Sequence, residues 1–149
     1  MGKKLGVIVP YRERDEHLKI FRKEIKKALK AQGIDYNLIV IQQDNAKLFN
    51  RGMLLNIGYL YAQELYKCDY VVFHDVDMIP KDVDYSYSDI PLHLATNFSS
   101  SKNNEVFDQY FGGVTMFPTE AFDKINGYSN KYWGWGFEDN ELLFRCIKS

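Results

Sequence analysis

Continuous apolar runs predict three buried strands in the first half of the chain. The runs lie at residues 5–9, 36–41 and 70–73, and each is rich in β-branched or aromatic residues. None of them alternates between apolar and polar positions, as a strand with one solvated face does. The runs are therefore typical of strands that are covered on both faces.

Helical spacing separates these runs. Apolar residues recur at intervals of three and four between Leu18 and Leu29, which predicts an amphipathic helix from about Asp15 to Gln32, ended by Gly33. A second helix is predicted from Arg51 to about Tyr66, with Asn50 as its N-cap. The resulting order of strand, helix, strand, helix, strand predicts an α/β fold with a Rossmann-like, mostly parallel sheet flanked by helices.

The second half is less regular. Strands are expected at residues 92–97 and 114–117. Thr119 is expected to cap a short helix that Gly127 ends, and a final helix is expected at 138–147, with acidic residues in its first turn. The chain has no internal repeat or linker, so residues 1–149 are interpreted as a single domain.

Composition places the chain among ordinary globular proteins. Of its 149 residues, 46% are hydrophobic and 26% are charged, which excludes a disordered or fibrous protein. The net charge of -1 argues against binding of nucleic acid by the overall charge of the protein. The lysine-rich face of the first helix is interpreted as a face exposed to solvent. No apolar run approaches the ~20 residues of a membrane span, and no signal peptide is recognised. With only two cysteines, predicted to be reduced thiols, and no signal peptide or membrane anchor, the protein is expected to be cytoplasmic.

Candidate chemistry gathers at the ends of the predicted strands. Asp75 and Asp77 follow the third strand, and carboxylates at such a position suit Mg²⁺ or Mn²⁺. Arg12 and Arg14 follow the first strand, and Arg51 begins a helix, so the three guanidinium groups fit a nucleotide diphosphate. Taken alone, the two aspartates could equally belong to an ordinary surface loop, and the three arginines could form ordinary surface salt bridges. The three histidines lack metal-ligand spacing and are interpreted as structural.

Residues 132–139, Tyr-Trp-Gly-Trp-Gly-Phe-Glu-Asp, form the most informative segment. The glycines interrupt regular structure, so the indoles of Trp133 and Trp135 are expected to project from an irregular loop, where they can stack on sugar rings. Glu138 and Asp139 follow at a helix start, where the dipole and free N–H groups are expected to lower the pKa of each carboxyl group. An ionised carboxylate beside a sugar platform suits a general base acting on a hydroxyl. The alternative is a buried aromatic wedge followed by an N-capping acid.

Five motifs, in the same order along the chain, resemble those of the β-1,4-galactosyltransferase family. Two features are most similar to the xylose-accepting branch of that family: His74, directly before Asp75, and the segment Glu138–Glu141. The motifs lie at residues 9–18, 49–58, 74–80, 110–114 and 126–139. The resemblance implies a GT-A-type nucleotide-sugar-binding fold. It also implies an inverting transferase that moves galactose from UDP-galactose to a saccharide acceptor with Mn²⁺ or Mg²⁺.

The resemblance implies a role for each matching residue. Asp139 is the catalytic base, Glu138 helps to bind the donor sugar, and Trp135 touches donor and acceptor. Asp77 is the direct metal ligand, with Asp75 in the same motif. The remaining donor-binding residues are Pro10, Tyr11, Arg12, Arg14, Phe49, Arg51, Tyr110 and Gly113.

Three departures from the family pattern bear on these roles. Asn140 stands where the family has a third acid, and Phe137 replaces a small or basic residue. The family draws further metal ligands from a His-rich segment beyond the final helix, which these residues do not include. Its eukaryotic members also carry a membrane anchor and stem, which are absent here, so a bacterial or viral origin is expected. Two alternatives therefore stay open: a transferase for another UDP-sugar such as UDP-N-acetylgalactosamine, and a catalytically impaired module that binds sugar nucleotides or glycans. The acceptor and the oligomeric state are not predicted.

Overall fold

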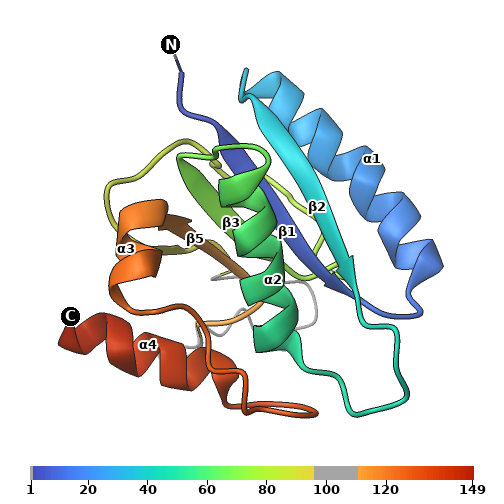
Figure 1. Cartoon of the computed structure of the whole chain (residues 1–149). Helices are drawn as coiled ribbons and strands as arrows, with labels where there is room; N and C mark the ends of the chain where they lie inside the picture. The colour runs from blue at the N-terminus through green and yellow to red at the C-terminus, as the bar shows by residue number, and fades with distance from the viewer. Residues whose placement is uncertain (1, 96–110) are drawn as a thin grey trace, which may run out of the picture.

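A mixed β-sheet forms the centre of the molecule (Figure 1). A computed structural model describes residues 2–95 and 111–149, and in this part of the chain the sheet has five strands in the order β2-β1-β3-β5-β4. β2 and β3 lie parallel to β1 on either side, whereas β5 is antiparallel to β3 and β4 is antiparallel to β5. The strands are β1 (Leu5–Tyr11), β2 (Tyr36–Gln42), β3 (Tyr70–His74), β4 (Leu92–His93) and β5 (Val114–Pro118).

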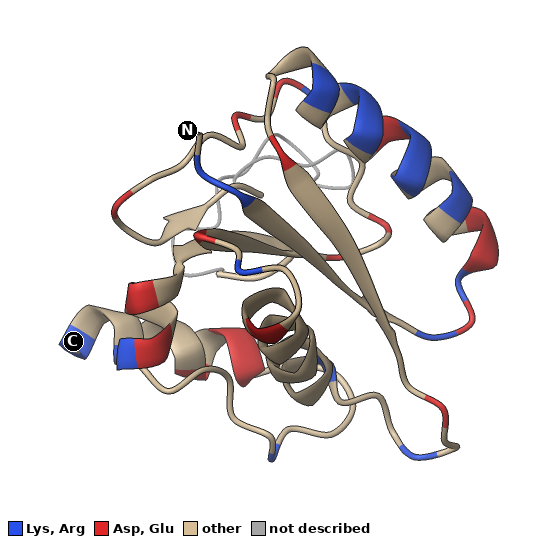
Figure 2. Ribbon diagram, turned by 45° about the horizontal axis from the view of Figure 1, so that its top comes forward, with Lys and Arg blue, Asp and Glu red and all other residues tan. Residues whose placement is uncertain are grey.

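Helices cover both faces of this sheet. α1 (Asp15–Ala31) packs on one face, and α2 (Arg51–Glu64) packs on the other, together with α3 (Thr119–Lys124) and α4 (Glu138–Lys148) (Figure 1). The solvent side of α1 carries exposed lysines and arginines, as expected for a solvated face (Figure 2). Within the described ranges, no helix has the length and apolar character needed to cross a bilayer.

Side chains alternate along β1, so this strand contributes to the hydrophobic cores on both faces of the sheet. Leu5, Val7 and Val9 belong to the core beneath α1, whereas Ile8 belongs to the core beneath α2. Gly58 lets α2 approach the sheet closely, because a Cβ there would lie 2.3 Å from Ile8 Cγ2. The apolar runs of the sequence are therefore continuous because both faces of the strands are buried.

The expected elements of the first half are confirmed, and the second half differs in detail. The Asn50 side chain caps α2 by accepting a hydrogen bond from Met53 N at 3.0 Å. The pairings of β5 and β4 are antiparallel, so the sheet is less parallel than the alternating first half suggested. Thr119 does not cap α3: it is the first helical residue, and its hydroxyl group donates to Asp69 O instead. The predicted strand at 92–97 is described only to residue 95, and only Leu92 and His93 pair with β5.

Candidate active site

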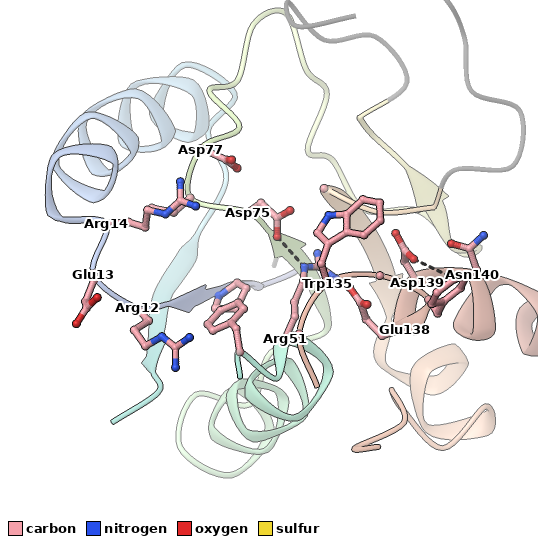
Figure 3. Close-up of a pocket in the computed structure, with 17 residues that line it drawn as sticks. Arg12, Glu13, Arg14, Arg51, Asp75, Asp77, Trp135, Glu138, Asp139 and Asn140 are labelled. Atoms are coloured by element: carbon pink, nitrogen blue, oxygen red, sulfur yellow. Dashed lines mark hydrogen bonds and ion pairs between the residues drawn. The ribbon is translucent and has the colours of Figure 1, made fainter. Parts of the chain in front are cut away.

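A pocket of about 750 Å³ opens where β1 and β3 end (Figure 3). These neighbouring parallel strands bring their carboxyl ends to one edge of the sheet, and the loop before α4 closes the other side of the pocket. Segments from across the whole chain thus meet in one cavity. The predicted site residues that line it are Pro10, Arg12, Arg14, Phe49, Arg51, Asp75, Asp77, Gly113, Trp135, Glu138 and Asp139.

Arg51 lies between two carboxylates at the base of this pocket. Its Nε donates to Asp75 Oδ1 at 2.7 Å, and its Nη1 lies 3.7 Å from Glu138 Oε1. The side chain is only 11% exposed. Burial alone lowers the pKa of Arg51, but the negative charges of Asp75 and Glu138 more than offset it, so that the pKa is raised. The guanidinium group is therefore a fixed positive charge that ties the ends of β3, α2 and α4 together.

The end of β3 turns so that both acids of the Asp75–Asp77 motif line the pocket. Met78 N donates to Asp75 O at 3.2 Å, which closes a tight turn, and Val76 is buried in the core beneath α1. Asp77 is exposed and has no hydrogen-bond partner among the described residues. His74 directly precedes Asp75, and burial lowers the pKa of its imidazole to about 4. The ring therefore adds no charge to the site at neutral pH.

These two acids fit a divalent cation that also takes ligands from elsewhere. Arg51 engages Oδ1 of Asp75, and no hydrogen bond to its Oδ2 is present in the described part of the chain. One oxygen of Asp75 and the carboxylate of Asp77 therefore stay available as hard ligands. The described residues contain no group of three or more His, Cys, Asp or Glu residues arranged for a metal ion. Further ligands, such as phosphate oxygens and water, would complete the coordination.

Arg12 shapes the loop between β2 and α2. Its Nη1 donates to the carbonyl groups of Asn45 at 3.1 Å and Lys47 at 2.6 Å, and its guanidinium carbon lies 5.5 Å from the centre of the Phe49 ring. Gln43, which sequence reasoning missed, accepts from Asn50 N at 2.8 Å and so fixes the same loop at the start of α2. Arg12 thus holds Phe49 at the pocket wall.

The aromatic segment is irregular, as the glycines predicted. Gly134 and Gly136 have φ angles of +88° and +98°, and Phe137 is left-handed at +75°. Gly134 N donates to Phe49 O at 2.7 Å, which attaches the segment to the loop before α2. Trp135 is 97% exposed at the pocket wall, so that its indole is free to meet a ligand.

Asn56 fixes the start of this segment. Its Nδ2 donates to Tyr128 O and to Asn130 Oδ1, both at 2.8 Å, and its Oδ1 accepts from Tyr128 N at 2.9 Å. Asn50 Nδ2 adds a bond to Asn130 O at 2.8 Å. The side chains of Asn56 in α2 and of Asn50, the N-cap of α2, therefore hold residues 128–130, directly before the aromatic residues. Sequence reasoning missed Asn56, because its partners lie more than 70 residues away.

The two acids that begin α4 differ in environment. Glu138 is 7% exposed, and burial raises its pKa, partly opposed by the positive charge of Arg51. The expectation of a lowered pKa is therefore wrong for Glu138, because desolvation outweighs the helix terminus. Asp139 is more exposed, and its Oδ1 accepts from Asn140 N at 2.8 Å.

One predicted donor-binding residue, Tyr11, lies away from the pocket, whereas the neighbouring Pro10 lines it. The Tyr11 side chain is 6% exposed, and its hydroxyl group donates to Asp15 Oδ1. Side chains alternate along a strand, so Pro10 and Tyr11 cannot face the same side. A nucleotide contact through this side chain is not supported by its placement. Tyr110 lies outside the described residues.

Glu13, Phe137 and Asn140 are among the pocket residues that were not predicted as site residues. Glu13, with a φ angle of +52°, lies between the two arginines that follow β1. Phe137 and Asn140, the positions that depart from the family pattern, also line the cavity. All three are exposed, so they can shape what the pocket accepts.

Two family models match consecutive parts of this chain. Residues 1–89 match the N-terminal region of glycosyl transferase group 7, and residues 92–149 match a region described as the N-terminal domain of galactosyltransferase. The chain is 42% identical to β-1,4-galactosyltransferase 4 of Rattus norvegicus over 95% of its own length and 42% of that protein. It is 37% identical to the xylosylprotein 4-β-galactosyltransferase of Caenorhabditis elegans, over 98% of its own length and 51% of that protein.

A solved structure is similar throughout the described fold. The Drosophila β-1,4-galactosyltransferase 7, in complex with manganese, UDP-Gal and xylobiose, superimposes with a TM-score of 0.86 at 35% identity. The match covers 96% of this chain and 60% of that one. The expected GT-A-type fold is therefore confirmed.

The same comparisons correct the expected origin and location. The relatives come from rodents, a nematode and other animals, so the expectation of a cytoplasmic protein of bacterial or viral origin is wrong. The chain spans about half the length of the curated relatives it matches. With matches that cover nearly all of its residues, the chain belongs to glycosyl transferase group 7, together with the β-1,4-galactosyltransferases.

Proposed function

We propose that this chain binds UDP-galactose in the pocket at the ends of β1 and β3 and transfers galactose, with inversion, to a hydroxyl group of a saccharide acceptor. The observation that carries this proposal is the meeting of three kinds of group in one cavity: arginines, the Asp75–Asp77 turn, and Trp135 beside Glu138 and Asp139. The relatives named as galactosyltransferases and the Drosophila complex with UDP-Gal support it.

The arginine side of the pocket is proposed to bind the nucleotide. Arg14 is exposed at the cavity, and Arg12 lies close to Phe49, so that a cationic and an aromatic group face the same space. Such groups suit a diphosphate and a uracil ring, respectively. Arg51 is proposed to act differently, since its guanidinium group is buried against Asp75 and Glu138 and balances their charge.

The Asp75–Asp77 turn is proposed to face the diphosphate. Asp77 and the unengaged oxygen of Asp75 would hold a divalent cation such as Mn²⁺, the ion named with the Drosophila relative. Bound there, the cation would neutralise charge on the departing diphosphate.

Asp139 is proposed as the general base. The acceptor hydroxyl oxygen attacks the anomeric carbon, the bond from that carbon to the β-phosphate oxygen breaks, and the hydroxyl proton passes to Asp139. The more exposed position of Asp139 supports this choice over Glu138, which is buried against Arg51. Trp135 is proposed to stack on the sugars and so to orient the attacking oxygen.

One observation favours a second function, a module that binds sugar nucleotides without turnover. The described residues hold no three-ligand metal group, so among them only the two carboxylates of the Asp75–Asp77 turn are offered to the cation.

Release of UDP from UDP-galactose distinguishes the two functions. It is measured with xylosides, with N-acetylglucosaminides and without acceptor, each with and without Mn²⁺. Release that needs both an acceptor and Mn²⁺ supports transfer. Tight UDP binding without release in any mixture supports the binding module, and the absence of UDP binding contradicts both.

A further inference from the structure

His74, the last residue of β3, connects the core to the backbone of the Asp75–Asp77 turn. The ring is 1% exposed; its Nδ1 lies 2.9 Å from Asp75 O, and its Nε2 lies 2.9 Å from the Tyr85 hydroxyl oxygen. A carbonyl oxygen can only accept, so Nδ1 must carry the proton and Nε2 must accept from Tyr85. The two contacts therefore fix one tautomer and one ring orientation.

Tyr85 is itself held from several sides. Its ring is fully buried, its backbone N donates to Gln32 Oε1 at 2.9 Å, and its carbonyl oxygen accepts from the Tyr70 hydroxyl group at 2.8 Å. Gln32 Nε2 in turn donates to Val83 O at 2.8 Å. The hydroxyl group that reaches His74 thus comes from a loop anchored to the end of α1 and to β3.

The other end of the connection is the peptide backbone of Asp75. Asp75 O accepts from both His74 Nδ1 and Met78 N, and Asp75 N donates to Gly113 O at 2.8 Å. Gly113 directly precedes β5 and lines the same pocket. This backbone is thereby held on both sides, and with it the direction in which the side chains of Asp75 and Asp77 leave the turn.

We propose that His74 and Tyr85 are positioning residues, which hold the Asp75–Asp77 turn in the orientation that binds a divalent cation on a nucleoside diphosphate. The inference rests on the proposed function. Neither side chain lines the pocket, so both act only through the turn. Groups that orient metal ligands in this way change metal affinity by ~10–100-fold when they are removed.

The chain offers a matched pair of variants for the test. Tyr85→Phe removes the hydroxyl group that bonds to His74, and Tyr70→Phe removes an equally buried hydroxyl group that bonds only to the backbone of Tyr85. Both lose one hydrogen bond of similar length in the same core, so similar losses of thermal stability are expected. Mn²⁺ affinity is measured from the electron paramagnetic resonance signal of free Mn²⁺ at saturating UDP.

The expected result is a loss of Mn²⁺ affinity of about tenfold in Tyr85→Phe and less than about twofold in Tyr70→Phe. In a His74→Leu background, Tyr85→Phe should cause no further loss, because the connection is already broken. Equal effects of the two tyrosine variants, or additive effects with His74→Leu, would overturn the inference.

Amide hydrogen exchange supplies a readout that needs no ligand. Exchange at Met78, whose N–H bonds to Asp75 O, should accelerate in Tyr85→Phe but not in Tyr70→Phe. If the unaltered chain binds neither UDP nor Mn²⁺, the proposed function fails, whereas unchanged Met78 exchange in Tyr85→Phe would refute the positioning role itself.

Discussion

Arg51 Nε lies 2.7 Å from Asp75 Oδ1, and this contact joins the first residue of α2 to the residue that follows β3. On the other side of the guanidinium group, Glu138 Oε1 lies 3.7 Å from Nη1. A single buried cation thus separates two carboxylates that would otherwise repel each other across the base of the pocket.

Replacing Arg51 with methionine should therefore destabilise the fold and distort the pocket. We expect a loss of about 2–4 kcal/mol in the free energy of unfolding, because Asp75 and Glu138 lose their counter-charge in a desolvated site. Urea denaturation measures this loss. Arg145→Met is the control. Arg145 pairs with Glu141 within α4, where both side chains are about one-third exposed, and it also donates to Ile125 O, so its loss should cost only about 1 kcal/mol. Equal losses in the two variants would show that the Arg51 pair is an ordinary surface contact.

Trp135→Ala should weaken acceptor binding without harming the fold. The indole is 97% exposed, so its removal should change the free energy of unfolding by no more than about 0.5 kcal/mol. Loss of a stacking surface should lower acceptor affinity about tenfold, as measured by calorimetry in the presence of UDP. Trp133→Ala is the matched control, because Trp133 is 43% exposed and does not line the pocket. The same loss in both variants would contradict a specific platform at Trp135.

Asn56→Ala should release residues 128–130 from α2. Three hydrogen bonds are lost, and Tyr128 N is left without its acceptor, so we expect a cost of about 2–3 kcal/mol in the free energy of unfolding. Amide exchange at Tyr128 should also accelerate. Gln63→Ala, which removes one partly exposed bond from the same helix to Cys68 O, should cost no more than about 1 kcal/mol. A similar cost for both would mean that Asn56 does not fix the segment.

These contacts show where sequence reasoning succeeds and where it stops. Strands and helices could be predicted because burial leaves a local pattern, as in the run at 70–73 and the cap at Asn50. The gathering of Asp75 and Arg12 at one sheet edge follows from parallel strands. The partners of Asn56 and Gln43 leave no such pattern, because a polar side chain has the same local spacing whether it meets water or a distant carbonyl group.

The same limit applies to the direction in which a side chain points. Tyr11 belongs to a motif next to arginines, yet strand alternation turns it away from the pocket. Glu138 sits at a helix start, which lowers a pKa, but only the packed structure reveals that burial outweighs this effect.

Stability should fall in alkaline solution because of Cys68. Burial raises the pKa of this thiol from 9.0 to about 11, so the unfolded chain loses its proton first as the pH rises. The stabilisation is complete below pH 9 and is lost as the pH rises through about 11. Unfolding free energies at about pH 8 and about pH 10 should differ by less in Cys68→Ala than in the unaltered chain. An identical difference in both would show that Cys68 does not contribute.

The central claim is that Asp139 removes the acceptor proton, and single-turnover transfer by Asp139→Asn tests it most directly. Asparagine keeps the size of the side chain but cannot accept the proton, so UDP affinity should stay within about twofold while the transfer rate falls ~10²–10⁴-fold, or about 3–5 kcal/mol of barrier. A transfer rate within about threefold of the unaltered chain, at unchanged UDP affinity, would contradict the assignment.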